Sequence, residues 1–391
     1  MSAEVQSSGP DLRRWQTPLV AVGVVCLALC AVGWLLSPDQ FFRSYLMAFV
    51  FWAGLTLGCL GVLMMQYVTG GAWGIILRRT LESATRTIPL VLVFFLPLLL
   101  GLHRLYVWTN SAVVEADPLL QHKRPFLNVP FFLARAAVYF VCWLALIFFL
   151  NRWSRRQDAT GEPRLAWRLE HLSAPGLFLL SVTISLALID WVMSLEPRWY
   201  STIYAVGFMA GEMLAAFAFS IAVVILLSSS PPLEGVVKPK HFRALGNLML
   251  TFVMLWAYCA FSQYLLIWSG NLRAEIPWYL RRITGGWGWI AIALIVFHFF
   301  LPFFLLLFRE IKDHRRTLVT VAAVVILLRF VDLFWLVEPA FYRDRFSLHW
   351  LDFAALFGLG AIWLAVFAWQ LRARPLLPLR DPYAEEAFAD E

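Results

Sequence analysis

The chain has 391 residues, of which 61% are hydrophobic and only 15% charged, with a net charge of +7. Soluble proteins carry about 25% charged residues, so a soluble fold of this length could not bury so much apolar surface. Nearly uncharged windows of about 20 residues recur along the whole sequence, as bilayer-spanning helices require. These features predict an all-α polytopic membrane protein.

Ten spans are predicted in chain order. They cover Pro18–Leu36, Tyr45–Val68, Thr87–His103, Val129–Leu150, Ser173–Leu195, Thr202–Leu227, Leu245–Trp268, Trp287–Phe308, Thr317–Val337 and Leu348–Leu371. The first span is predicted to be retained as a helix, because no small-residue cleavage site follows it. Residues 1–17 form an N-terminal segment, and residues 372–391 form a Pro-rich and then acidic tail that is predicted to be mobile.

The basic residues predict the orientation of the chain. Lys and Arg are about twice as frequent in the loops on the N-terminal side as in the opposite loops, which places both termini in the cytoplasm. The net charge then reflects this topology and contact with anionic membrane lipid. A nucleic-acid partner is excluded, because no soluble basic domain exists to bind one.

A repeated motif links the fifth and ninth spans. "DWVMSLEPRWY" begins at Asp190 and "DLFWLVEPAFY" begins at Asp332, with Asp, Glu, Pro and Tyr at identical offsets. Equivalent helices four spans apart run in the same direction, so the motif predicts a parallel repeat. Chance similarity in an apolar background is the alternative. Glu196 and Glu338, each followed by proline, mark the outer exits of the two helices.

The repeat divides the chain into units. Spans two to five form a first four-helix bundle (43–197), and spans six to nine form a second (198–340). Single helices flank them at 18–36 and 348–371. Ten transmembrane helices in two parallel bundles with two flanking helices is therefore the predicted fold.

Six ionisable side chains are predicted to lie inside spans, where a charge costs about 2.5–3.5 kcal/mol. At a rise of about 1.5 Å per residue, three lie about 9 Å below the outer surface and three lie about 15–18 Å below it. The shallow three are Arg135, Asp190 and Asp332, and the deep three are Glu212, His298 and Arg329.

Two interpretations of these groups are open. Arg135 can neutralise Asp190, and Arg329 can neutralise Glu212 or Asp332, which would make each set a structural ion pair. Two cations against three acids leave one acid over, and a carboxyl group in low dielectric is then protonated or exchanges its proton. Chains of Asp, Glu and His in membrane helices are typical of proton relays. The full set therefore favours a proton path through both bundles.

The sequence predicts no catalytic residue, no metal site and no covalently bound cofactor. All five cysteines lie within spans and form no CxxC or CxxCH motif, so neither an iron–sulfur site nor a c-type haem is expected. His103 and His298 differ in depth by about 15 Å, which disfavours bis-histidine ligation of a b-type haem.

Together these features resemble the NrfD/polysulfide-reductase membrane-subunit family. Within it they look most like the second such subunit of bacterial alternative complex III, a quinol:cytochrome c oxidoreductase. The resemblance is carried by "DWVMSLEPRWYSTIY" from Asp190, "LQHKRPFLN" from Leu120, "TGGAWG" from Thr69 and the ten-span layout.

The resemblance implies a subunit without redox centres of its own, in the inner (plasma) membrane of a bacterial cell. Electrons would pass from a quinol such as menaquinol to haem and iron–sulfur clusters on partner subunits. Those partners would be a sister NrfD-like quinol-binding subunit, an iron–sulfur subunit and multihaem cytochrome c subunits. Similarity to the sister subunit's quinol pocket makes His103 and Asp190 the candidates for a quinone contact in this chain.

Two other functions compete with this one. A secondary transporter would use the buried charges to bind ions or substrate, but such proteins have spans broken near mid-membrane. The prolines of this chain lie at or towards span ends, so no centrally broken span is expected. A purely structural anchor for an iron–sulfur subunit is the third possibility, and it leaves the buried acids without a role.

Overall fold

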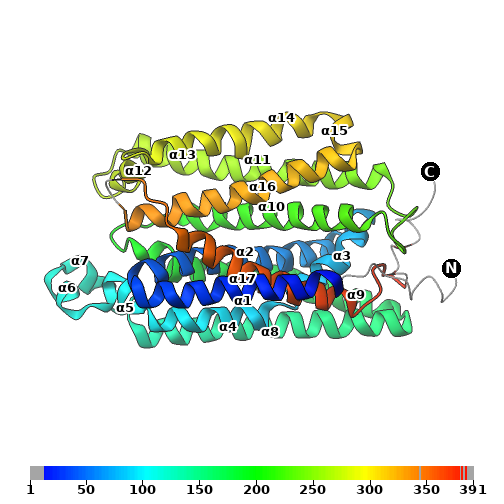
Figure 1. The fold of residues 1–391 in the computed structure, drawn as a ribbon, viewed down its shortest axis with the longest axis horizontal. Helices are drawn as coiled ribbons and strands as arrows, with labels where there is room; N and C mark the ends of the chain where they lie inside the picture. Colours follow the sequence, from blue (N-terminus) through cyan, green and yellow to red (C-terminus); the bar gives the residue numbers. More distant parts are fainter. Residues whose placement is uncertain (1–12, 343–344, 379, 382–383, 385–391) are drawn as a thin grey trace.

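The structure is a computed structural model that describes residues 13–342, 345–378, 380–381 and 384. Within these residues, ten helical stretches are long and apolar enough to cross a membrane. They lie side by side as one elongated bundle (Figure 1). The predicted all-α, ten-span membrane fold is confirmed.

The helices that form the spans follow one another in chain order. Those of the first half are α1 (Arg13–Leu36), α2 (Pro38–Thr69), α3 (Ala72–Thr85), α4 (Ile88–Leu100), α8 (Val129–Thr160) and α9 (Pro163–Trp191). Those of the second half are α10 (Thr202–Leu227), α11 (Pro239–Gly270), α13 (Trp287–Ala293), the π-helix η4 (Leu294–Phe300), α14 (Leu301–Leu307), α16 (Arg315–Val337) and α17 (Trp350–Arg372).

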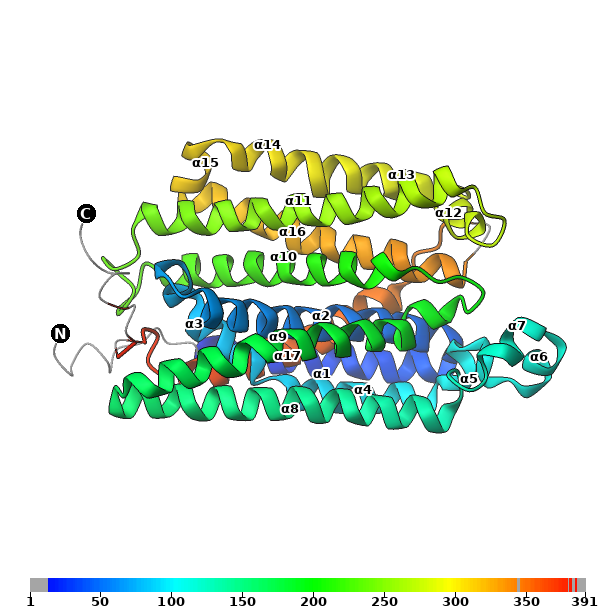
Figure 2. The ribbon, with the colours of Figure 1, turned by 180° about the vertical axis from the view of Figure 1, so that it is seen from behind.

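Short helices occupy the connections. They are α5 (Leu102–Leu105), η2 (Val107–Thr109), α6 (Ser111–Ala116), α7 (Pro118–Lys123), η3 (Met193–Leu195), α12 (Ile276–Ile283), α15 (Arg309–Asp313) and η5 (Glu338–Ala340). Both ribbon views place α5, α6, α7 and α12 at one end of the bundle and α3 and α15 at the other (Figures 1 and 2). The predicted topology makes the first of these ends the outer one.

Helix α2 is the centre of the bundle. It contacts α1, α3, α4, α9, α10, α16 and α17, and 94% of its most apolar window is buried. Only 17% of the corresponding window of α1 is buried, because α1 packs mainly on α17 at the edge of the bundle. Apolar side chains on the free face of α1 therefore suit contact with lipid.

Glycines permit the close approach of α2 to α10. Gly54 and Gly58 on α2 have the GxxxG spacing, and a Cβ atom added to Gly58 would lie 2.3 Å from the carbonyl oxygen of Glu212. Gly207 and Gly211 repeat this spacing on α10. Since the α2 backbone touches the α10 backbone at Glu212, the helix crossing itself positions this buried acid.

The two halves have the same pattern of neighbours. In the first half, α2 contacts α3, α4 and α9, and α8 contacts α4 and α9. In the second half, α10 contacts α11 and α16, and the span formed by α13, η4 and α14 contacts α11 and α16. A parallel repeat requires this order. Superposition of the two bundles, 43–197 and 198–340, stays a prediction.

The third span differs from the expectation. The sequence predicts Thr87–His103, whereas the structure forms a span over Trp73–Leu100, and His103 lies beyond it in α5. The inner half of this span contains charged residues that lower its hydropathy. Glu82 pairs with Arg79 at 2.8 Å and is buried, so these charges are neutralised inside the protein rather than in a loop.

The expectation that no span is broken centrally is wrong. The third span is interrupted by a turn at Arg86 and Thr87, just before Pro89, and the eighth contains the π-helix η4. Proline explains the ends of both irregular segments, because it lacks a backbone N–H. Pro302 in α14 cannot donate to the carbonyl oxygen of His298 four residues earlier, and α-helical bonding is interrupted there.

The tail is also more ordered than the sequence suggests. Arg374 donates to Glu82 at 3.0 Å, Asp381 forms an ion pair with Arg78, and Leu377 is buried. The described part of the tail is therefore docked against the inner end of the bundle, because its charged groups find buried partners there. Most of the acidic sequence "YAEEAFADE" lies outside the described residues, as do residues 1–12 of the N-terminal segment.

Candidate functional site

One arginine holds two acids in the interior of the second half. Arg329 and Asp332 are three residues apart on α16 and share a helix face, and α10 places Glu212 opposite them. Arg329 Nη2 donates to Glu212 Oε1 at 2.8 Å, and Arg329 Nη1 donates to Asp332 Oδ2. The side chains of Glu212, Arg329 and Asp332 form what we call the central triad, and no member is more than 4% exposed.

The central triad has spare proton-binding capacity. It contains one cation and two carboxyl groups, so it is neutral only when it also holds a proton. Glu212 Oε2 is buried and has no hydrogen-bond partner among the described residues. A charged oxygen in such a position is costly, and a proton on it would remove the charge. The triad therefore offers a site for one proton.

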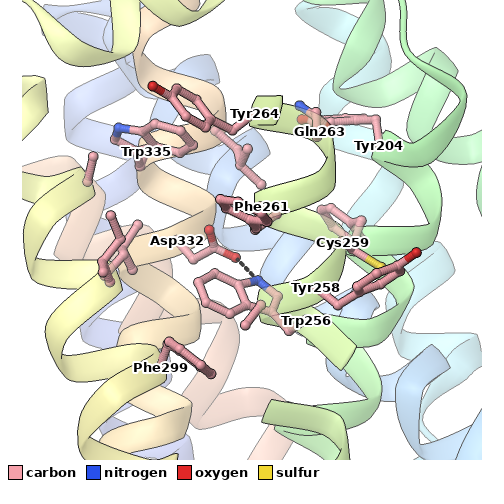
Figure 3. A pocket seen from close by; sticks show the side chains of 18 of the residues that line it. Tyr204, Trp256, Tyr258, Cys259, Phe261, Gln263, Tyr264, Phe299, Asp332 and Trp335 are labelled. Carbon is pink, nitrogen blue, oxygen red and sulfur yellow. Dashed lines mark hydrogen bonds between the residues drawn. The ribbon is translucent and has the colours of Figure 1, made fainter. Parts of the chain in front are cut away.

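Two aromatic rings extend the triad towards the eighth span. Trp256 Nε1 on α11 donates to Asp332 Oδ2 at 3.1 Å (Figure 3). The Trp256 ring meets the His298 ring edge-on, with 4.4 Å between centroids. His298 is fully buried in η4, and neither ring nitrogen has a hydrogen-bond partner among the described residues. The predicted second-bundle residues thus form one contiguous group.

The first half contains a simpler ion pair. Arg135 on α8 makes two hydrogen bonds to Asp190 on α9, at 2.9 Å and 2.6 Å. Tyr139 donates to the same carboxylate at 2.8 Å, and the Arg135 guanidinium stacks on the Phe126 ring at 3.8 Å. One acid faces one cation, and every carboxylate oxygen is bonded. The pairing of Arg135 with Asp190 that the sequence allowed is confirmed. For Arg329 the sequence left Glu212 and Asp332 as alternatives, and the structure pairs it with both.

The two candidates for a quinone contact are not joined by a hydrogen bond within the described residues. Asp190 is fully buried, and its carboxylate oxygens are bonded to Arg135 and Tyr139. His103 is exposed on α5 at the outer end of the bundle. The structure therefore supplies no geometry for a quinone held between His103 and Asp190.

The two motif glutamates have different surroundings. Glu196 follows η3 and forms ion pairs with Arg281 and Arg282, the latter at 2.7 Å. These ion pairs connect α12 to the segment that follows η3, at the outer end of the bundle. Glu338 begins η5 and is 1% exposed, and neither of its carboxylate oxygens has a partner among the described residues. Equal offsets in the sequence thus lead to different local chemistry.

A cavity of about 610 Å³ lies beside Asp332 (Figure 3). Residues from α10, α11, α12, α13, η4 and α16 line it, and most are apolar or aromatic. The charged and amide side chains among them are Arg329, Asp332 and Gln263. Sequence reasoning missed this cavity. The aromatic-rich stretch "WAYCAFSQY" from Trp256 to Tyr264, which contains Gln263, is the signal that could have indicated it.

Sequence reasoning also missed a buried charge cluster at the inner end. Glu82 accepts hydrogen bonds from Arg79, Arg374, Tyr67 and Ser154, at 2.5–3.1 Å. It is 1% exposed. The spacing of Arg79 and Glu82, three residues apart, was the available signal. This cluster joins α2, α3, α8 and the tail.

No protein-family model matches the chain, and no curated protein matches it either.

Proposed function

We propose that this chain is an integral membrane subunit of a quinol-oxidising respiratory or photosynthetic electron-transfer complex, a quinol:cytochrome c oxidoreductase, and that it conducts protons. The observation that carries the proposal is the central triad, in which one buried arginine faces two buried acids and Glu212 Oε2 has no described partner. A structural ion pair needs one acid per cation, so the second acid calls for a role.

In this function the triad holds a proton within the membrane. Arg329 donates a hydrogen bond to each of the two carboxyl groups, so it stabilises whichever of them is ionised. Glu212 Oε2 is the atom free to bind the proton. Water can relay a proton between buried groups that do not touch. The Arg135–Asp190 pair has no second acid within the described residues. In the path, Arg135 therefore holds the Asp190 carboxylate in position.

The resemblance to NrfD-like subunits supports the remaining parts of the proposal. The chain lies in the inner membrane of a bacterial cell with both termini in the cytoplasm. Its partners are a sister quinol-binding subunit, an iron–sulfur subunit and multihaem cytochrome c subunits, which carry the redox centres. Menaquinol or a related quinol is the electron donor.

Two substitutions test the proton role in the assembled complex. Glu212→Gln and Asp332→Asn keep size and polarity but remove the exchangeable proton. Each is expected to lower quinol-driven turnover and proton release by tenfold or more, a factor typical of losing a proton-transfer group, while the haem content of the complex stays unchanged. The matched control is Asp313→Asn, which breaks a cytoplasmic ion pair outside the path. Normal turnover and proton release in both triad variants would leave only structural pairing.

A secondary transporter is the second candidate function, because the third span is interrupted by a turn at Arg86 and Thr87 and the eighth contains the π-helix η4. Irregular segments within spans are typical of transporter binding sites. Affinity purification in mild detergent separates the candidates. Co-purification of multihaem cytochrome and iron–sulfur subunits supports the proposed complex. Purification alone, with ion-driven uptake of a solute in proteoliposomes, supports a transporter.

A purely structural anchor predicts a third result. The chain would then co-purify with its redox partners, but Glu212→Gln and Asp332→Asn would leave proton release intact.

A further inference from the structure

We infer that the cavity beside Asp332 binds the ring of a lipid-soluble quinol, with Asp332 Oδ1 as the acceptor of a hydrogen bond from a ring hydroxyl. The inference rests on the proposed function, because it adds a quinol site in the second half of the chain to that function. Its support comes from four features of the cavity: volume, wall chemistry, a free acceptor and an opening towards lipid.

The volume and the walls suit a flat ring. About 610 Å³ lies within the range of about 300–1,000 Å³ that small-molecule sites occupy. Trp256, Phe299 and Trp335 come from three different helices and present aromatic side chains around the space (Figure 3). Aromatic rings pack favourably by stacking or edge-to-face contact, so walls of this kind favour a planar aromatic guest.

Asp332 supplies one free acceptor at the inner wall of the cavity. Its Oδ2 atom already accepts hydrogen bonds from Arg329 and Trp256. Its Oδ1 atom accepts none from a described residue. An acceptor facing an apolar cavity is stabilised by a guest that carries a donor, and a ring hydroxyl is such a donor.

The cavity opens towards the surface that faces lipid. Tyr258 and Phe261 on α11 line it and are 67% and 62% exposed, and Ile295 on η4 is 53% exposed. These residues lie in the middle of their spans, where the exposed surface contacts hydrocarbon. A guest therefore enters sideways from the bilayer, which requires a lipid-soluble molecule such as a quinol with an isoprenoid tail.

A phospholipid fits this site less well. An acyl chain carries no donor for Asp332 Oδ1. A phosphate group would need a free cation near the mouth of the cavity, but Arg281 and Arg282 at the outer end are both engaged by Glu196. The chemistry of the cavity thus favours a hydroxyl-bearing ring over an ordinary lipid.

Binding can be measured on the purified full-length chain without its redox partners. The chain is placed in phosphatidylcholine nanodiscs under anaerobic conditions and titrated calorimetrically with a short-chain menaquinol and with its dimethyl ether. The ether keeps the ring but cannot donate a hydrogen bond. It is expected to bind about tenfold more weakly than the quinol, the usual effect of losing one hydrogen bond to a charged acceptor. In Asp332→Asn this difference should shrink to about twofold.

Two alanines on α13 give a matched pair of variants. Ala291 lines the cavity, whereas Ala293 on the same helix does not, and both are half-buried. Ala291→Phe fills the cavity and is expected to weaken quinol binding by tenfold or more, while Ala293→Phe changes it less than twofold. Neither substitution alters the central triad.

The outcomes separate this inference from the proposed function. Absence of quinol binding, equal binding of quinol and ether, or equal effects of Ala291→Phe and Ala293→Phe would overturn it. Each of those results concerns only the cavity, because the proton role is tested by turnover of Glu212→Gln in the assembled complex. Tight quinol binding that Ala291→Phe abolishes and Ala293→Phe preserves supports the site.

Discussion

Glu212 on α10 and Gly54 on α2 face each other so closely that a Cβ atom at position 54 would lie 2.3 Å from the carboxyl carbon of Glu212. Arg329 holds the same carboxylate from another helix, at 2.8 Å. Helix α2 therefore contributes space rather than a side chain to the central triad. The absence of a side chain at Gly54 is as much a part of the site as the charges.

Gly54→Ala is expected to displace the Glu212 carboxylate and to lengthen its hydrogen bonds to Arg329. Crowding at a buried site and loss of a charged hydrogen bond each cost about 1–3 kcal/mol, so the melting temperature should fall by several degrees. Gly61→Ala on the same helix is the matched control, because its Cβ would lie 3.7 Å from the nearest atoms. Equal melting temperatures for the two variants would contradict the crowding.

The Arg135–Asp190 pair should show strong coupling in a double-mutant cycle. Arg135→Leu leaves a buried carboxylate with Tyr139 as its remaining side-chain partner, at a cost of about 3–5 kcal/mol. Asp190→Leu in addition should recover much of that loss, because no uncompensated charge remains. The exposed pair Arg104–Asp39 is the control, and its loss should change the melting temperature little. Additive effects at Arg135 and Asp190 would argue against a buried pair.

The spans and the ion pairs could be predicted from the sequence because their physical signals are local or one-dimensional. A run of apolar residues indicates a span, and depth along the helix follows from the rise per residue. Arg329 and Asp332 are three residues apart, so their contact follows from helix geometry alone. Arg135 and Asp190 lie at equal predicted depth on adjacent spans, which left few alternative partners.

The remaining features depend on helices far apart in the sequence. The low hydropathy of Glu82 and Arg79 excluded them from the predicted third span. A hydropathy profile contains no information on their partners, and Arg374 and Ser154, which both donate hydrogen bonds to Glu82, are distant in the sequence. The lack of a partner for Glu338 among the described residues could not be predicted either, since Glu196, at the equivalent position of the repeated motif, pairs with two arginines of α12. The cavity exists only where α11, α13 and α16 pack imperfectly, and packing defects leave no pattern in a single segment.

The Arg243–Asp313 pair at the inner end gives a pH-dependent prediction. The hydrogen bond from Arg243, at 2.7 Å, lowers the pKa of Asp313 below its ordinary value of about 3.9. A carboxyl group with a lowered pKa in the folded state stabilises the fold above its ordinary pKa. That stabilisation is lost as the pH falls through the lowered value.

Wild type should therefore melt slightly above Asp313→Asn at about pH 7 and about pH 5, and the difference should shrink as the pH falls below the ordinary Asp pKa of about 3.9. Thermal unfolding of both proteins in detergent at each pH measures this. A difference that grows as the pH falls would have the wrong sign for a lowered pKa.

The topology can be tested with two cysteine substitutions on opposite sides of α8. Glu115 in α6 and Glu162 after α8 are both exposed, and α8 is the one span between them. A membrane-impermeant maleimide added from outside should label Glu115→Cys and leave Glu162→Cys unlabelled until the membrane is permeabilised. Wild type, with its native cysteines in the spans, gives the background labelling. Labelling of both variants from the same side would refute the ten-span arrangement.

The docked tail leads to a prediction about Arg374. This residue binds Glu82 at 3.0 Å and lies among buried groups, whereas Arg372, two residues earlier, binds Gln16 at 2.8 Å in a half-buried position. Arg374→Ala leaves Glu82 with Arg79 as its remaining ion-pair partner, at a cost of about 1–3 kcal/mol, the penalty for weakening a buried charged hydrogen-bond group. Arg372→Ala should cost less, since water can replace its bond.

Limited proteolysis provides the second measurement. The tail should be cleaved faster in Arg374→Ala than in Arg372→Ala, because Glu82 is the contact that ties residue 374 to α3. Equal cleavage rates and equal melting temperatures would mean that the tail docks through its other contacts, the buried Leu376 and Leu377 and the Asp381–Arg78 pair, rather than through this ion pair.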